Sequence, residues 1–172
     1  VSTVFCGDGS LEEGAFYESA NFASVRNLPV LFICENNLYS VYSHLRVRQP
    51  MGRKIHKMVE AIGVPSALVD GNDPQAVYEA AVAAIDHIRQ GQGPFFLELT
   101  TYRWREHCGP NYDNNIGYRT EEEFQEWKQK DPIPRFEEKL LTERMLDRLE
   151  VKDMEDEIQA EIQTAFDFAE NS

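Results

Sequence analysis

The chain has 172 residues, enough for one domain with a hydrophobic core, and its 42% hydrophobic content is that of a folded protein. Its formal net charge of −13 argues against nucleic acid or an anionic membrane as a partner. No apolar run approaches the ~20 residues that span a bilayer and no signal peptide is evident, so we expect a cytoplasmic protein.

Strands and helices alternate from the start of the chain. Residues 1–6 form a short apolar run that predicts a strand, and Ser10-Leu-Glu-Glu13 has the form of a capping box that opens a helix. Residues 30–34 are apolar at every position, as in a strand covered on both faces of a parallel sheet. The next connection is about twenty residues long, which is typical of functional or mobile loops.

The alternation continues through the middle of the chain. It predicts a helix at 55–62, a strand at 67–69, a helix from Asp73 to Gly91 and a strand at 95–102. In the second of these helices, Asp73 is the expected N-cap and Pro74 the first helical residue. Residues 103–119 lack a hydrophobic repeat and predict a loop, and a helix capped by Thr120 opens the C-terminal part. We therefore expect an α/β fold with a mostly parallel sheet flanked by helices, its core at 1–119, and C-terminal helices at 120–172 packed on the same domain.

Two of the predicted strands end in unusual polar segments, Gly7-Asp8-Gly9-Ser10 and Glu35-Asn36-Asn37. Ligands of such sheets bind beyond the carboxyl ends of the strands, and one α/β unit separates these two ends. Each segment, taken alone, is also compatible with a tight turn in which the polar side chain caps nearby backbone. Together they point to one binding site at neighbouring strand ends.

The residue types fit a metal-bound diphosphate. Mg²⁺ takes hard oxygen ligands and shares them among a carboxylate, water and phosphates. Asp8 offers the carboxylate, Asn37 an amide oxygen, and the turn after Asn37 a main-chain carbonyl. Gly7 and Gly9 allow close approach of the backbone, and the N-terminus of the following helix favours an anion.

Gly7-Asp8-Gly9 followed by Asn36-Asn37 resembles the GDG…NN motif of thiamine-diphosphate enzymes. The flanking sequence EEGAFYESANFASVRNLPVLFICENNLYSVYS, together with TYRWREH and GYRTEEEFQEWKQKDPI, is similar to the alpha subunits of 2-oxo-acid dehydrogenase E1 components. The similarity runs from about Val4 to Asp167 and implies the diphosphate-binding fold of that family, with thiamine diphosphate and Mg²⁺ as cofactors.

The resemblance also implies roles for individual residues. The implied Mg²⁺ ligands are Asp8, Asn37 and the carbonyl of Tyr39, and the implied cofactor-binding residues are Gly7, Asp8, Gly9, Ser10, Asn37, Tyr39, Arg103 and His107. His107 matches a catalytic loop histidine beside the cofactor, and Arg103 an arginine that helps order this loop. Cys108 stands where relatives carry a phosphorylated serine, which puts that form of control in doubt.

The implied enzyme oxidatively decarboxylates a 2-oxo acid, or cleaves acetoin, and transfers the acyl group to a lipoyl E2 component. The family's aminopyrimidine-activating glutamate lies on the beta subunit, so an α2β2 heterotetramer is expected and the chain alone should be inactive. The family's N-terminal portion has no counterpart here, so we expect a fragment or a second chain that supplies it. The alternatives are a truncated, non-catalytic remnant and another thiamine-diphosphate enzyme, a transketolase-like half.

Three further features of the sequence concern basic, histidine and cysteine residues. His44, Arg46, Arg48 and Arg53 form a basic cluster in the loop after Asn37, which is either a solvated loop or a gate that attracts an anionic substrate or cofactor. His56 and His87 fall in predicted helices and are expected at the surface. The three cysteines form no CxxC pair, so neither a zinc site nor a disulfide framework is expected.

Overall fold

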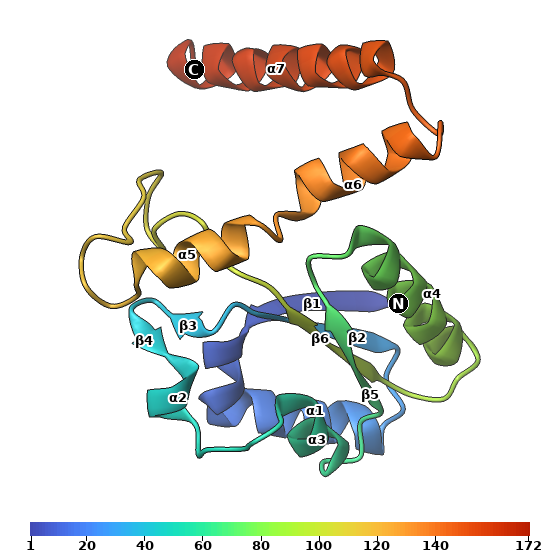
Figure 1. Ribbon diagram of the computed structural model, residues 1–172. Helices are drawn as coiled ribbons and strands as arrows, with labels where there is room; N and C mark the ends of the chain where they lie inside the picture. The colour runs from blue at the N-terminus through green and yellow to red at the C-terminus, as the bar shows by residue number, and fades with distance from the viewer. The chain divides into compact units, whose positions relative to one another are not determined.

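The computed structural model describes residues 1–172, which form two compact units, Val1–Asp131 and Pro132–Ser172. The first unit contains a four-stranded sheet of order β1-β2-β6-β5, in which every neighbouring pair is parallel (Figure 1). The strands are β1 (Ser2–Gly7), β2 (Val30–Asn36), β5 (Ser66–Asp70) and β6 (Phe95–Thr100). The expected α/β fold with a parallel sheet is therefore confirmed.

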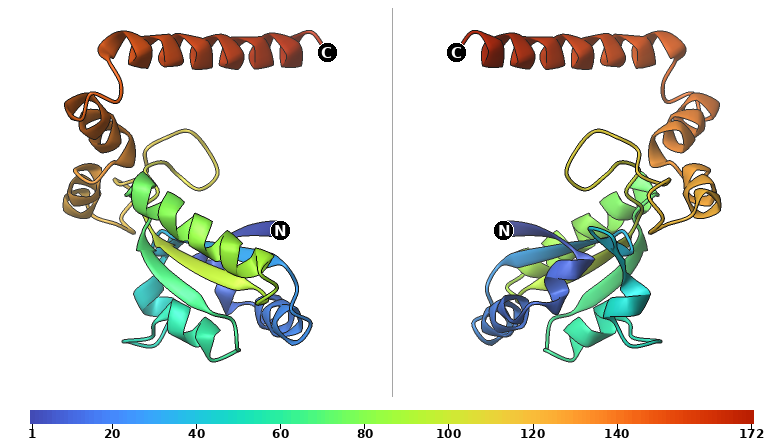
Figure 2. Two further views of the ribbon diagram at one scale, coloured as in Figure 1. Left: turned by 90° about the vertical axis from the view of Figure 1, so that its right-hand side faces the viewer. Right: turned by 90° about the vertical axis from the view of Figure 1, so that its left-hand side faces the viewer.

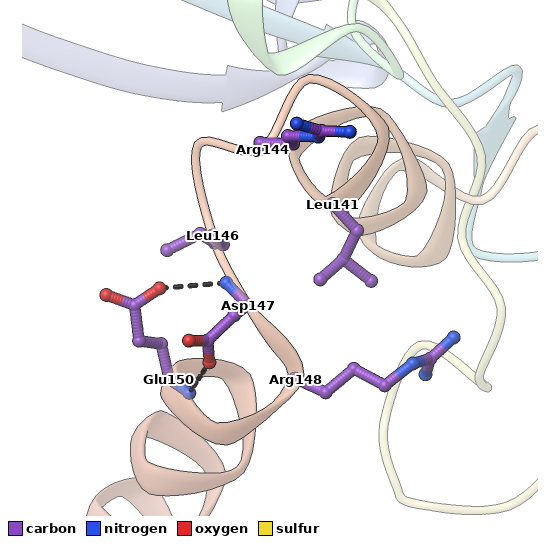
Figure 3. Close-up of a pocket in the computed structure, with 6 residues that line it drawn as sticks. All are labelled: Leu141, Arg144, Leu146, Asp147, Arg148 and Glu150. Carbon is purple, nitrogen blue, oxygen red and sulfur yellow. Dashed lines mark hydrogen bonds between the residues drawn. The ribbon is translucent and has the colours of Figure 1, made fainter.

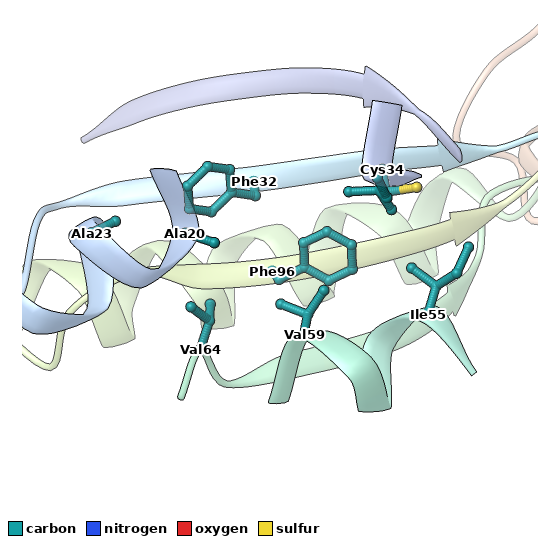
Figure 4. Packing of buried hydrophobic residues seen from close by; sticks show 9 residues of the cluster. Ala20, Ala23, Phe32, Cys34, Ile55, Val59, Val64 and Phe96 are labelled. Atoms are coloured by element: carbon teal, nitrogen blue, oxygen red, sulfur yellow. The ribbon is translucent and has the colours of Figure 1, made fainter. Parts of the chain in front are cut away.

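Helices cover both faces of this sheet. α1 (Gly14–Val25) and α3 (Ile55–Glu60) lie on one face and α4 (Pro74–Arg89) on the other (Figure 2). Alternate side chains of a strand point to opposite faces. Phe32 and Cys34 of β2 accordingly pack in the core cluster with α1 and α3 (Figure 4), whereas Leu31 and Ile33 pack with α4. Burial on both faces explains why this strand is apolar at every position.

The predicted capping box at Ser10 is wrong. Asp8–Glu12 forms a 3₁₀ turn, η1, and α1 begins only at Gly14, with Glu13 as an N-cap that makes no side-chain hydrogen bond. A 3₁₀ turn has three residues per turn, so Asp8 and Leu11 lie on the same side, and both are buried. Burial of this pair fixes the turn and leaves Ser10 inside it instead of at a helix start.

The two other predicted caps are confirmed. The Asp73 carboxylate accepts hydrogen bonds from the backbone N–H groups of Gln75 at 3.0 Å and Ala76 at 3.1 Å, which starts α4 at Pro74. The Thr120 hydroxyl accepts from the N–H of Glu123 at 3.1 Å and starts α5 (Glu121–Lys128). Each removes an unpaired N–H of a first helical turn.

The long connection after β2 contains short elements of its own. β3 (Tyr39–Ser40) and β4 (Ser43–His44) form a small antiparallel hairpin, and α2 (Leu45–Arg48) is a single helical turn. The connection between β6 and α5 contains no helix or strand, in agreement with the predicted loop. Cys6, Cys34 and Cys108 are all free thiols.

The second unit consists of α6 (Pro132–Thr142) and α7 (Arg148–Glu170). A reciprocal capping box opens α7: Asp147 accepts from the N–H of Glu150 at 2.9 Å, and Glu150 accepts from the N–H of Asp147 at 2.8 Å (Figure 3). A hollow of about 460 Å³ lies beside this turn and holds none of the predicted site residues. None of the helices has both the length and the apolar character needed to cross a membrane. The expectation that 120–172 pack on the core as one domain stays a prediction.

Candidate functional site

The two polar segments singled out in the sequence lie at neighbouring strand ends. β1 and β2 are adjacent and parallel, and the last residue of β1, Gly7, is opposite Glu35 in the register. Asp8 therefore leaves the sheet beside Asn36 and Asn37. The expected convergence at the carboxyl edge of the sheet is confirmed as geometry.

Asp8 is buried, and only one of its two carboxylate oxygens has a partner. Its side chain is 1% exposed, and its Oδ2 pairs with the guanidinium of Arg48. Its Oδ1 is buried and has no hydrogen-bond partner in the chain. Buried polar atoms are nearly always paired, and an unpaired charged oxygen is costly. A cation bound at Oδ1 would remove that cost.

The Asn36-Asn37 turn is held by side-chain amides. Asn36 donates from Nδ2 to Glu98 Oε1 at 2.8 Å, and its Oδ1 accepts from the N–H of Leu38 at 3.2 Å. Leu38 has a φ of 71°, a left-handed conformation that is costly for a branched side chain without such support. Asn37 Oδ1 accepts from the N–H of Tyr39 at 3.0 Å, which leaves one lone pair of the amide oxygen for another ligand.

Tyr39 can contribute to the site only through its backbone, because its side chain points into the protein. The residue is 4% exposed, and its hydroxyl donates to Glu123 Oε1 at 2.7 Å, an oxygen that also accepts from Tyr102 at 3.2 Å. Burial raises the pKa of Tyr39, and it raises the pKa of Tyr102 to about 12, so both hydroxyls stay protonated donors. This pairing fixes α5 against the turn that follows Asn37.

The two glycines of the first segment differ in the space available for a Cβ atom. A Cβ on Gly9 would lie 2.6 Å from Ser40 Oγ and 2.8 Å from Ser40 Cβ, whereas a Cβ on Gly7 would meet nothing within 4 Å. Gly9 therefore permits η1 to contact the β3–β4 hairpin. Gly7 and Ser10 are exposed at the open end of the sheet, where a ligand's phosphates can approach them.

Only one side chain of the basic cluster contacts the proposed site. Arg48 alone of its members pairs with Asp8, while Arg46 is exposed and Arg53 bonds Gln49 at 3.0 Å. His44 caps α2: its Nδ1 accepts from the N–H of Arg46 at 2.9 Å. Burial, and after it the charge of Arg46, lower the pKa of His44, so the imidazole stays neutral and able to accept.

Two arginines hold the loop at 103–119 in place, one through the β3–β4 hairpin and one through contacts within the loop. Arg103 donates from Nη2 to the carbonyl of Val41 at 2.9 Å and to the hydroxyl of Tyr118 at 3.0 Å, which ties the loop to the β3–β4 hairpin. Arg119 is buried, donates to the carbonyl of Arg103 at 2.6 Å and pairs with Asp113. His107, in contrast, is exposed and makes no described hydrogen bond.

Comparison with known proteins decides the family. The model of the dehydrogenase E1 component family matches residues 1–172. The chain belongs to the dehydrogenase E1 component family. The predicted resemblance is thereby confirmed over the whole chain.

Relatives within the family are alpha subunits. The chain is 38% identical over 169 residues to the 2-oxoisovalerate dehydrogenase subunit alpha of Bacillus subtilis, covering 98% of this chain and 50% of that protein. It is 33% identical over 172 residues to the pyruvate dehydrogenase E1 component subunit alpha of Porphyra purpurea, covering 100% of this chain and 49% of that protein. The chain thus spans about half the length of the curated relatives it matches.

A solved transketolase from Pichia stipitis also aligns with the chain. The TM-score is 0.46 at 25% identity, and the alignment covers 57% of this chain and 14% of the transketolase. The alpha-subunit relatives match nearly the whole chain.

Family membership implies thiamine diphosphate as the cofactor, and the residues present fit it together with a metal. The unpartnered Asp8 Oδ1 supplies a hard anionic ligand, and the open end at Gly7 and Ser10 is free for phosphates. The first unit and the second hold no group of three or more His, Cys, Asp or Glu side chains suited to a metal ion. The proposed ligands are one carboxylate, one amide oxygen and one main-chain carbonyl, and only the carboxylate belongs to those four side-chain types.

Several residues around this site were not predicted from the sequence. Glu98 is 5% exposed and joins Asn36 to His56, whose Nδ1 lies 2.8 Å from Glu98 Oε2. The expectation of a surface position for His56 is wrong, because its side chain is 13% exposed and paired with this buried carboxylate. In the sequence, Glu98 could have been recognised as the single acidic residue in the apolar run of β6. Nothing in the sequence singles out Arg119 or Asp113.

Proposed function

We propose that the chain is the Mg²⁺- and thiamine-diphosphate-binding half of an E1 alpha subunit. Asp8, Asn37 and the Tyr39 carbonyl would hold the metal, and Gly7, Gly9 and Ser10 would lie against the diphosphate. The observation that carries the proposal is the buried, unpartnered Oδ1 of Asp8 at the edge of the sheet where Asn37 also emerges. The match to the E1 family over the whole chain supports the identity of the ligand.

The assembled enzyme would oxidatively decarboxylate a 2-oxo acid, or cleave acetoin, and transfer the acyl group to a lipoyl E2 component. Thiamine diphosphate, when bound, supplies the carbanion-stabilising ring that such chemistry requires. The protein's part is to position and to stabilise charge. In this chain, Asp8 would offer a negatively charged oxygen to the metal, and the Glu98–Asn36 hydrogen bond keeps the Asn37 turn in place.

The loop would complete the site at its mouth. Arg103 holds the loop through Val41 and Tyr118, and this supports a role in ordering the segment that carries His107. His107 is exposed, which suits a side chain that contacts the cofactor or substrate at the entrance. We propose it as the catalytic histidine of this loop.

The remaining parts of the proposal concern the assembly. A beta subunit would supply the acid–base residue that activates the cofactor, in a cytoplasmic α2β2 heterotetramer. The C-terminal helices at 120–172 would pack on the α/β core. The printed names of the relatives, pyruvate dehydrogenase and 2-oxoisovalerate dehydrogenase, limit the first substrates to test to pyruvate and branched-chain 2-oxo acids, with acetoin beside them.

The test is cofactor binding followed by turnover. The full-length protein, expressed with its beta subunit, should bind thiamine diphosphate only with Mg²⁺ present in calorimetry and reduce an acceptor dye with one of the three substrates. The 172-residue chain alone should give no turnover. Metal-dependent binding without turnover of any substrate would favour the non-catalytic remnant, and absence of binding would refute the proposal.

A further inference from the structure

Arg48 is the cation closest to the proposed metal ligand, and three groups hold it there. Its Nη2 pairs with Asp8 Oδ2, its Nη1 with Glu12 Oε1, and its Nε donates to the carbonyl of Ser43 at 2.9 Å. Its side chain is 11% exposed although it belongs to a single-turn helix in a long connection. The guanidinium is therefore fixed in place.

The two oxygens of the Asp8 carboxylate lie in different environments. Oδ2 faces Arg48, while Oδ1 is buried and unpartnered. An aspartate side chain can rotate about its terminal bond and exchange the two oxygens unless one of them is held. The ion pair with Arg48 holds Oδ2 and thereby keeps the two oxygens from exchanging.

We propose that Arg48 is a positioning residue for the metal: its guanidinium holds Oδ2 of Asp8 and thereby presents Oδ1 to Mg²⁺. This inference rests on the proposed function. Carboxylates that bind metals are themselves held by hydrogen bonds from outside the coordination shell, and removal of such a partner typically weakens metal binding 10–100-fold. An arginine suits this place because it is always charged and offers several donors in one plane.

The anchors of Arg48 connect the two sides of the proposed site. Glu12 ends η1, which carries Asp8, and it also accepts from Gln49 Nε2 at 2.9 Å. Ser43 belongs to the β3–β4 hairpin, which carries the proposed carbonyl ligand Tyr39. Arg48 thus links the element that carries the proposed carboxylate ligand to the hairpin that carries the proposed carbonyl ligand, and a bound Mg²⁺ would need both at closely defined distances.

The test uses the full-length protein assembled with its beta subunit. Binding of Mn²⁺, as a paramagnetic substitute for Mg²⁺, is measured by electron paramagnetic resonance, and Mg²⁺-dependent binding of thiamine diphosphate by calorimetry. Arg48→Met should weaken both about 10–100-fold. Arg48→Lys should recover part of the loss, because one ammonium can hold Oδ2 but cannot reach Glu12 and Ser43 at once.

Arg46→Met is the matched control. Arg46 lies in the same helical turn, carries the same charge and is exposed, and its side chain makes no described hydrogen bond or ion pair. Its replacement should change both affinities by less than about threefold, because exposed charges are screened by solvent. An equal loss in Arg46→Met would mean that net charge alone acts and would overturn the inference.

The remaining outcomes distinguish failure of the positioning role of Arg48 from failure of the proposed function. If Arg48 merely occupies the place of the metal, Arg48→Met would bind Mn²⁺ more tightly, and tighter or unchanged binding overturns the inference. If the wild-type protein binds neither Mn²⁺ nor the cofactor, the proposed function itself fails. If Arg48→Met does not keep the wild-type circular dichroism spectrum, Arg48→Lys carries the test, with intermediate affinity expected and wild-type affinity contradicting the inference.

Discussion

The substitution Gly9→Ala tests whether the contact between η1 and the β3–β4 hairpin is as close as the structure has it. The added Cβ would lie 2.8 Å from Ser40 Cβ, whereas carbon atoms normally meet at about 3.5–4.0 Å. Ser40 Oγ, at 2.6 Å, can rotate away, but Ser40 Cβ moves only with the backbone. The two segments must therefore separate by roughly 0.7 Å or more.

The expected magnitude follows from this overlap. Overpacking of this kind costs about 1–3 kcal/mol, so the free energy of unfolding should fall by that amount. Gly9 adjoins Asp8 and Ser40 adjoins Tyr39, so the separation also pulls apart two of the proposed metal ligands. Because Mg²⁺ tolerates little departure from its ligand distances, the affinity for metal and cofactor should fall as well.

Urea denaturation of the ligand-free protein measures the effect on stability, with Gly7→Ala as the matched control in the same turn. Gly7 has a φ of −81° and open space at its Cβ, so alanine should cost little there. Ser40→Gly removes both clashing atoms, and the double variant Gly9→Ala/Ser40→Gly should regain most of the lost stability. Equal stability of Gly9→Ala and Gly7→Ala, or a double variant whose losses simply add, would refute the steric argument.

Three further predictions concern the ligand, the loop and pH. Asp8→Ala should abolish Mg²⁺-dependent thiamine diphosphate binding in calorimetry while the circular dichroism spectrum stays that of the folded protein; unchanged affinity would remove Asp8 from the ligand set. Residues 103–119 should exchange backbone hydrogens more slowly once Mg²⁺ and thiamine diphosphate are added to the assembled protein, and strong protection before and after addition would contradict this. The lowered pKa of His44 means that the folded state favours neutral imidazole, so its contribution to stability is present above the usual pKa of 6.5 and is lost as pH falls through the lower, folded-state pKa. His44→Asn, which keeps a helix-capping acceptor, should flatten the pH dependence of the urea midpoint below pH 6.5, and an identical profile in both proteins would speak against the role of His44.

Local patterns account for the parts of the fold that were predicted correctly. Asp73-Pro74 predicts the start of α4 because an N-cap and a proline act within one turn of the chain. Residues 30–34 predict a doubly covered strand because every side chain there is apolar. The same locality misled at Ser10, where the burial of Asp8 and Leu11 outweighed the capping pattern.

For this protein, the sequence by itself determined the α/β alternation, the polar strand ends and the family, since each depends on residues close together in the chain or on a motif of fixed spacing. The tertiary structure decided which partners these residues have. Arg48 pairs with Asp8 across 40 positions, and Glu98 bonds Asn36 across 62. No spacing rule relates residues so far apart: they meet because the fold brings α2 of the connection after β2 against η1 and sets β6 beside β2, and buried polar groups are stabilised by such partners.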